Sequence, residues 1–238
     1  ILAVGGGTLL GTLTPSVELY QPADNTWEFT APLPAPVADH AGTTHQGILY
    51  VSGGFSGGKT LRDTYSYLPR LRRWVGNRAM GFTRCGHGLA AARDRIFCVG
   101  GRTLGRVREW IQVEEMEYYC PRSNQWTTLT PAPFSCCQFS LTAHGTTLYL
   151  AGGGSLQHMQ KEDTVFLYDT ERQVWKKGSP LPTALVDHAS CMIRLSQANA
   201  GGEMGRGTED PSTGSWETSP LSLFTTRQQE SHSVPEKK

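Results

Sequence analysis

The sequence predicts an all-β protein built from four copies of one strand-rich unit. Four Tyr-to-Trp pairs share a seven-residue spacing: Tyr20–Trp27, Tyr67–Trp74, Tyr119–Trp126 and Tyr168–Trp175. Upstream of each pair, an apolar run is closed by two glycines: Gly5-Gly6, Gly53-Gly54, Gly100-Gly101 and Gly152-Gly153. Successive glycine pairs lie 48, 47 and 52 residues apart. A period near 50 residues made of strands and turns is typical of a β-propeller, in which each repeat forms one blade.

The apolar run before the glycines is the first predicted strand of each repeat. The four runs are Ile1–Val4, Leu49–Ser52, Ile96–Val99 and Leu148–Ala151. Short runs rich in β-formers are typical of strands buried on both faces, so we expect an inner strand of the blade here. Paired glycines after such a strand allow positive φ and close approach of a neighbouring segment.

A strand with alternating polarity follows, and a tight turn connects it to the strand that carries the tryptophan. The turn is visible as Pro22-Ala23-Asp24-Asn25 and as Pro121-Arg122-Ser123-Asn124. Because the distance from Tyr to Trp never changes, we predict a hairpin of constant turn length and register.

The outer strand is predicted to end soon after each tryptophan. Prolines stand five and seven residues after three of the four tryptophans, and proline cannot donate to a sheet ladder. Thirteen residues after each tryptophan stand His40, His87, Phe139 and His188, each opening a strand of small residues. Each repeat therefore has four strands, and the recurring histidines are interpreted as structural groups that hydrogen-bond a neighbouring blade.

Double glycine, spaced Tyr and Trp, and four-fold recurrence together resemble the kelch repeat over residues 1 to about 195. The expected repeats are 1–39, 40–86, 87–138 and 139–187, with 188–195 as a closing strand. The resemblance implies a kelch β-propeller of six four-stranded blades, of which four are recognisable, so two blades are expected upstream of Ile1.

Residues 196–238 are predicted to form a disordered C-terminal tail. They contain six large apolar side chains in 43 positions. Such a segment buries too little apolar surface to offset an ordering entropy of roughly 1–2 kcal/mol per residue.

Composition excludes several classes of protein. No apolar run approaches the ~18 residues of a membrane span, so no membrane contact is expected. The six cysteines lack a CxxC pair and match no zinc site, so we expect free, structural thiols and a cytoplasmic location. The formal net charge is only +1 and no base-reading motif is present, which argues against a nucleic-acid partner.

No constellation of catalytic side chains stands out. Three of the histidines recur at one repeat position, which favours a structural role over catalysis. The runs Gly5–Gly7 and Gly152–Gly154 are not phosphate-binding loops, because no GK[ST] sequence follows them. We therefore expect no enzyme, no cofactor and no metal ion.

Charge is unevenly distributed along the chain. Residues 55–108 contain twelve Lys or Arg against two acids, and several of the basic residues fall in loops after the glycine pairs. The third such loop is the longest and contains Trp110, outside the repeat framework, beside arginines. Two interpretations remain open: a site for an acidic peptide, or a solvated basic rim with Trp110 packed against the propeller. The candidate partner-binding residues are Lys59, Arg62, Arg84, Arg102, Arg106, Arg108, Trp110, Phe134, Gln157, His158 and Lys161.

The covered region resembles the C-terminal propeller of the kelch-like (BTB–BACK–kelch) family. In that family the propeller captures a substrate protein, while BTB and BACK domains bind a cullin scaffold. The resemblance implies a substrate adaptor of a cullin–RING ubiquitin ligase, whose cullin contact would lie in domains absent from this chain. The alternative from another class is an actin-associated kelch scaffold with no role in ubiquitin transfer.

Overall fold

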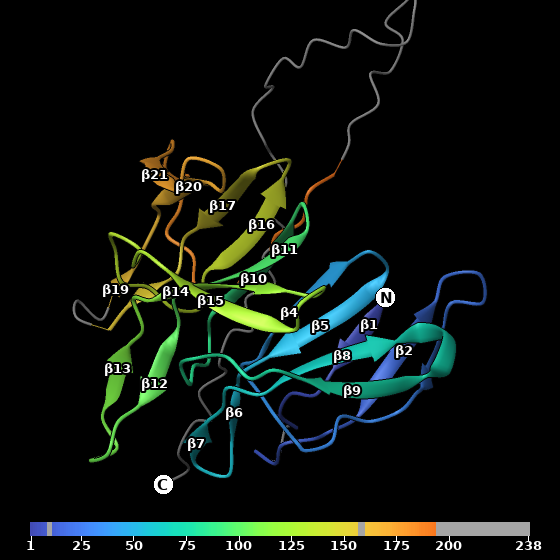
Figure 1. The fold of residues 1–238 in the computed structure, drawn as a ribbon. Helices are drawn as coiled ribbons and strands as arrows, with labels where there is room; N and C mark the ends of the chain where they lie inside the picture. The colour runs from blue at the N-terminus through green and yellow to red at the C-terminus, as the bar shows by residue number, and fades with distance from the viewer. Residues whose placement is uncertain (9–10, 157–159, 194–238) are drawn as a thin grey trace, which may run out of the picture. The chain divides into compact units, whose positions relative to one another are not determined.

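The computed structural model describes residues 1–8, 11–156 and 160–193, and regular structure in this part of the chain is almost entirely β (Figure 1). Its helical content is one short 3₁₀ turn, η1 (Pro69–Leu71). No helix among the described residues is long and apolar enough to cross a membrane. The expected all-β class is therefore confirmed.

Four antiparallel sheets correspond to the four repeats in the described part of the chain. The first sheet has three strands, and the second, third and fourth have four strands each, which pair in the order in which they occur in the sequence. The second sheet comprises β4 (Ala41–His45), β5 (Ile48–Ser52), β8 (Thr64–Leu68) and β9 (Arg73–Asn77). The third comprises β10 (Gly88–Ala92), β11 (Arg95–Val99), β14 (Met116–Cys120) and β15 (Gln125–Leu129). The fourth comprises β16 (Ser140–His144), β17 (Thr147–Ala151), β20 (Val165–Asp169) and β21 (Val174–Lys177).

The first sheet has three strands, β1 (Leu2–Val4), β2 (Val17–Gln21) and β3 (Thr26–Phe29). It corresponds to the last three strands of the other sheets. Two-stranded hairpins interrupt the later repeats: β6 (Phe55–Ser56) with β7 (Lys59–Thr60), β12 (Arg102–Leu104) with β13 (Trp110–Gln112), and β18 (Gly154–Ser155) with β19 (Gln160–Lys161).

The strands of small residues, not the apolar strands before the glycines, lie where neighbouring sheets meet. β10 lies beside both β4 and β16 (Figure 1). The apolar strand is second in each sheet, which corrects the expectation that it would be the inner one. Small side chains explain the order: a Cβ on Gly88 of β10 would stand 2.6 Å from the Cβ of Leu141 of β16.

The predicted Tyr–Trp hairpin is present in all four sheets. Each tyrosine is directly opposite its tryptophan, and the ring centroids lie 4.8 to 5.3 Å apart. The residue two places before each tryptophan has positive φ, between 46° and 57°, at Asn25, Arg72, Asn124 and Gln173. A left-handed residue at a constant position explains why the turn length does not vary.

The tryptophans also attach each sheet to the one before it. The indole N–H of Trp74 donates to the carbonyl of Ala31 at 2.9 Å, and that of Trp126 donates to Arg78 at 2.8 Å. Trp74 belongs to the apolar cluster between the first two sheets, and Trp175 to the large cluster between the third and fourth. The aromatic rings therefore fill space between blades, as the sequence predicts.

A chain of backbone hydrogen bonds links successive repeats. The N–H of Gly86 donates to Asp39, that of Gln138 to Gly86, and that of Asp187 to Gln138, at 2.7 to 2.9 Å. All four residues have positive φ, between 52° and 60°. Repeats therefore meet through backbone as well as side chains, at the residue before each recurring histidine or phenylalanine.

The C-terminal boundary remains a prediction. Residues 188–193 form no strand in the structure, and residues 194–195 of the predicted closing strand lie outside the described residues. The predicted tail, 196–238, also lies outside them.

Candidate partner-binding face

All the long connections emerge at the same end of the sheets, here called the loop end. In the second repeat, residues 53–63 join β5 to β8, and residues 78–87 join β9 to β10. Because neighbouring strands are antiparallel, both segments leave the sheet at one end, while short hairpin turns occupy the other, the turn end. The loop end therefore offers the variable surface of the molecule.

Threonine hydroxyls connect the first two hairpins of the loop end. The Thr60 and Thr103 hydroxyl oxygens lie 2.8 Å apart, and Thr103 lies 2.7 Å from the hydroxyl of Thr83. The side-chain oxygen of Gln112 accepts a hydrogen bond from the backbone N–H of Leu156, beside the third hairpin, at 3.3 Å. The three hairpins thus form one connected surface.

Trp110 is a fixed aromatic group on this surface. Its ring centroid lies 5.8 Å from that of Phe55, and the Arg102 guanidinium carbon lies 4.5 Å from it, within cation–π range. Trp110 is nevertheless 39% exposed. The ring packs the long loop and at the same time presents a face to solvent.

Further cationic and apolar groups lie on or beside the two hairpins that carry Phe55 and Trp110. Lys59, Arg62, Arg106 and Arg108 are exposed, whereas Arg102 is half-buried and lies 3.9 Å from the carboxylate of Asp39. Two further apolar side chains of the same loop are exposed, Val107 at 84% and Ile111 at 45%. This mixture suits a polypeptide partner with acidic and apolar side chains.

The fourth repeat contributes less that can be described. Lys161 is exposed on β19, and its hairpin adjoins the one that carries Trp110. Gln157 and His158, also predicted for the site, lie outside the described residues.

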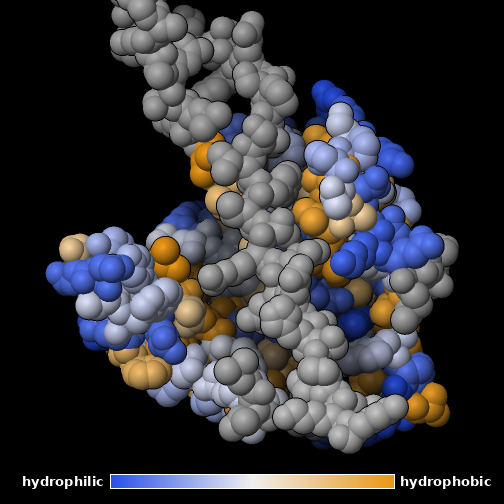
Figure 2. Space-filling model, turned by 180° about the vertical axis from the view of Figure 1, so that it is seen from behind, coloured by the Kyte–Doolittle hydropathy of each residue, from blue (hydrophilic) through white to orange (hydrophobic). Residues whose placement is uncertain are grey.

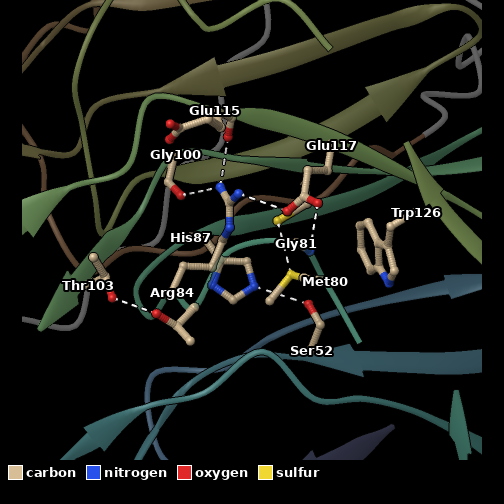
Figure 3. Close-up of polar contacts among 12 residues, drawn as sticks. Ser52, Met80, Gly81, Arg84, His87, Gly100, Thr103, Glu115, Glu117 and Trp126 are labelled. Carbon is tan, nitrogen blue, oxygen red and sulfur yellow. Dashed lines mark hydrogen bonds and ion pairs between the residues drawn. The ribbon is translucent and has the colours of Figure 1, made fainter. Parts of the chain in front are cut away.

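Arg84 is not available to a partner, which corrects its assignment to the site. Its side chain is fully buried, and its guanidinium forms a 3.0 Å ion pair with Glu117, which is 1% exposed. The same guanidinium donates to the carbonyls of Gly100 and Glu115, at 3.0 and 2.8 Å (Figure 3). Arg84 lies in the loop end by sequence, but its side chain points between the second and third sheets.

Glu117 was not singled out in the sequence, although alignment of the repeats contains a signal for it. It stands two residues before Tyr119, where the other three repeats have Glu18, Tyr65 and Phe166. Its carboxylate also accepts from the backbone N–H of Gly81, at 2.8 Å. Gly81 occupies the position at which the other three repeats have their second proline. Proline has no backbone N–H, whereas the N–H of Gly81 needs an acceptor, which the Glu117 carboxylate provides. The absence of the proline and the presence of the carboxylate are therefore linked.

Phe134 is half-buried and packs between the third and fourth sheets rather than standing free on the loop end. Its ring stacks on Phe166, with centroids 4.1 Å apart and planes 16° apart, and it meets Trp175 edge-on at 4.9 Å. It forms one wall of a groove of about 530 Å³ between these sheets.

The recurring histidines hold sheets together. His87 hydrogen-bonds the hydroxyl of Ser52 at 3.1 Å (Figure 3). A Cβ added to Gly53 would stand 2.6 Å from the His87 ring. The rings of His40 and His188 lie in the same way against Gly5 and Gly152, where an added Cβ would stand 3.1 and 2.8 Å from the ring carbon Cε1. Burial, together with the nearby Arg84, holds the pKa of His87 well below 6.5, so its ring is neutral at physiological pH. These contacts support the structural interpretation.

Cys85, Cys98, Cys136 and Cys137 are buried as free thiols. Burial raises the pKa of Cys85 to about 11 and that of Cys98 to about 12, and it also raises the pKa of Cys136 and Cys137. Such thiols stay protonated and poorly nucleophilic. Across residues 1–8, 11–156 and 160–193, no three His, Cys, Asp or Glu side chains gather in a way that could hold a metal ion.

One face of the molecule is shown in Figure 2, where hydrophobic and hydrophilic residues alternate in small patches.

Comparison with protein families identifies the repeats. A family profile described as the Kelch motif matches residues 36–75, 83–133 and 135–182. Kelch-like protein 36 of Bos taurus is 30% identical over 198 residues, covering 82% of this chain and 32% of that protein. Kelch-like protein 34 of Homo sapiens is 31% identical over 206 residues, covering 83% of this chain and 31% of that protein. The chain thus spans about a third of the length of these relatives.

Two further similarities come from other proteins. Alpha-scruin of Limulus polyphemus is 30% identical over 179 residues, covering 70% of this chain and 19% of that protein. The solved structure of YjhT superimposes with a TM-score of 0.61 at 17% identity, covering 71% of this chain and 59% of that chain. At that identity the likeness concerns the fold alone, and it supports the β-propeller assignment.

Proposed function

Because the chain belongs to the kelch-repeat family, we propose that it is the substrate-recognition part of a cullin–RING ubiquitin-ligase adaptor. Its kelch-like and scruin relatives support the broader assignment, a kelch-repeat domain for protein interaction. The ligase assignment rests on similarity to kelch-like proteins over most of this chain. The cullin contact would belong to BTB and BACK domains outside this chain, and the complex would act in the cytoplasm.

The observation that carries the binding role is the exposed Trp110 held between Phe55 and Arg102. A rigid, half-exposed indole bordered by arginines has the composition of an interaction hot spot, because it buries large area at little entropic cost. The surrounding positive charges favour an acidic peptide segment through charge-assisted hydrogen bonds. The proposed contacts are Lys59, Arg62, Arg102, Arg106, Arg108, Trp110, Lys161 and the undescribed Gln157 and His158.

The binding role is tested by comparing two triple variants at opposite ends of the sheets. The loop-end variant R106A/R108A/W110A removes two arginines and one exposed apolar side chain. The matched turn-end variant R70A/L71A/R73A removes the same kinds of group, because Leu71 is 63% exposed.

The partner proteins that the wild-type chain and the two variants capture from cells are quantified, and a thermal melting curve is recorded for each of the three proteins. The loop-end variant should keep its melting curve and lose at least tenfold in capture, while the turn-end variant retains it. Equal capture by all three chains would remove the loop end from the binding site.

The ligase role needs a separate measurement. Partners captured through the loop end should accumulate in cells when the cullin scaffold is inactivated, because an adaptor leads to degradation of what it binds. Unchanged abundance of every loop-end partner would contradict the ligase role and leave the binding role intact.

The second candidate, from another class of function, is an actin-associated kelch scaffold with no role in ubiquitin transfer. This function predicts that the chain sediments with actin filaments in the absence of any cullin. Sedimentation that the loop-end variant abolishes, with no change in partner abundance, would favour the scaffold.

A further inference from the structure

Two of the interfaces between adjacent sheets contain a groove at the same repeat position. The groove between the third and fourth sheets has a volume of about 530 Å³, and the one between the first and second about 190 Å³. Their linings coincide when the repeats are superimposed: Val37 corresponds to Cys136, and Tyr65 to Phe166. The position is therefore a property of the repeat.

At the middle interface, between the second and third sheets, an arginine occupies this position. Arg84 corresponds to Cys136, and Glu117 to Phe166. The Arg84 guanidinium reaches the carbonyls of Gly100 and Glu115 and the carboxylate of Glu117 (Figure 3). The chain itself thus shows that this inter-sheet space accepts a guanidinium.

The groove between the third and fourth sheets keeps the backbone surroundings of that arginine, but it has Cys136 in place of the arginine and Phe166 in place of Glu117. Gly152 and Thr164, which line it, are the counterparts of Gly100 and Glu115, whose carbonyls bind Arg84. Cys136 is much shorter than arginine, which accounts for open space here.

The groove also has the charge and the walls that suit a cation. Glu114 and Glu162 line it, and none of the described residues that line it is basic. The stacked rings of Phe134 and Phe166 form part of its wall. A guanidinium forms charge-assisted hydrogen bonds with carboxylates and packs its plane on aromatic faces. The groove contains both kinds of group, the two glutamates and the two phenylalanine rings.

We infer that this groove binds an arginine side chain from a basic segment of a partner polypeptide. The charge preference is opposite to that of the hairpin surface around Trp110, so the groove is a second, separate specificity. The inference depends on the inter-sheet geometry and not on the ligase or scaffold role.

The test uses the tripeptide acetyl-Gly-Arg-Gly-amide and the same peptide with citrulline, a neutral isostere of arginine. The reporter is the indole N–H signal of Trp175 in NMR spectra, assigned with W175F, since its ring meets Phe134 at 4.9 Å. The arginine peptide should give a saturable shift, and the citrulline peptide should bind at least tenfold more weakly.

Two variants locate the response within the chain. E114Q/E162Q should weaken binding of the arginine peptide at least fivefold, because the groove loses both lining carboxylates. The matched variant D63N removes the carboxylate that lines the smaller groove and should leave the Trp175 response unchanged. C136R/F166E copies the Arg84–Glu117 pair and should abolish binding by filling the groove.

Three results would overturn the inference: no saturable shift up to the solubility limit of the peptide, equal binding of the citrulline peptide, or undiminished binding to E114Q/E162Q. Should C136R/F166E fail to fold, the citrulline comparison and the E114Q/E162Q variant still decide the question. Because all readouts concern the groove, a negative result leaves the loop-end role untouched.

Discussion

Replacement of Glu117 by Gln should strongly destabilise the protein. In the native structure Glu117 is 1% exposed and pairs with a fully buried arginine at 3.0 Å. Glutamine has nearly the same shape, and its oxygen can still accept from the N–H of Gly81. The substitution therefore removes the negative charge and leaves the packing in place.

The expected loss is set by the buried guanidinium that remains. After the substitution, Arg84 keeps the carbonyls of Gly100 and Glu115, but its charge has no counter-charge. Removing one partner of a buried ion pair typically costs about 3–5 kcal/mol, because the other charge stays desolvated. We expect E117Q to lower the free energy of unfolding by an amount in this range, measured by urea titration with tryptophan fluorescence.

An exposed ion pair in the same chain supplies the control. Glu28 lies 3.2 Å from Arg72, but their side chains are 42% and 60% exposed. Solvent screening leaves such pairs less than about 1 kcal/mol, so E28Q should be nearly silent. A loss below about 1 kcal/mol for E117Q as well would refute the argument that burial makes the Arg84–Glu117 pair indispensable.

The other repeats supply a replacement for the pair. The variant G81P/R84C/E117F introduces the residues that stand at the equivalent positions Pro133, Cys136 and Phe166. These apolar residues leave no buried charge without a counter-charge, although they line an open groove at their own interface, and proline removes the N–H from which Glu117 accepts a hydrogen bond. We expect this variant to be more stable than E117Q; equal or lower stability would show that the three residues do not act as one unit.

Three further predictions follow from the inter-sheet contacts, each measured by urea unfolding. W74A should lower the free energy of unfolding by about 3–5 kcal/mol, because Trp74 packs against the preceding sheet. W27A should cost less than half of that, because Trp27 is 51% exposed. A loss below about 1 kcal/mol for W74A would contradict the packing. The pKa of His87 is depressed in the folded protein, so the unfolded chain binds the proton more tightly. Stability should therefore be full above pH 6.5 and fall as pH drops below it, with a shallower slope in H87F; parallel pH profiles would exclude His87 as a source of the loss. G100A should destabilise the protein clearly more than G145A, although both positions have a φ of +60°. The added Cβ at position 100 would lie 2.7 Å from a carbonyl oxygen, whereas the one at position 145 meets nothing within 4 Å. Equal losses would mean that backbone strain alone sets the cost of both substitutions.

Much of the loop-end surface was within reach of sequence reasoning. The length of the third loop and the placement of Trp110 beside arginines were visible in the spacing of the repeats. The support of Trp110 by Phe55 was not, because Phe55 belongs to the preceding repeat and only inter-sheet packing brings the two rings to 5.8 Å. Arg84 was assigned to the site for a related reason: its segment lies at the loop end, but the direction of its side chain depends on Glu117, 33 residues later.

The sequence by itself determined the repeat, the Tyr–Trp hairpin and the strand composition of each blade, because these follow from local turn chemistry and side-chain periodicity along a continuous stretch of chain. The order of strands within a blade needed the tertiary structure, since only the meeting of β4, β10 and β16 shows why small residues lie where sheets adjoin. The difference between a filled and an open inter-sheet groove likewise depends on side chains from two repeats sharing one buried space. Burial and charge pairing are properties of that shared space, and no single repeat encodes them.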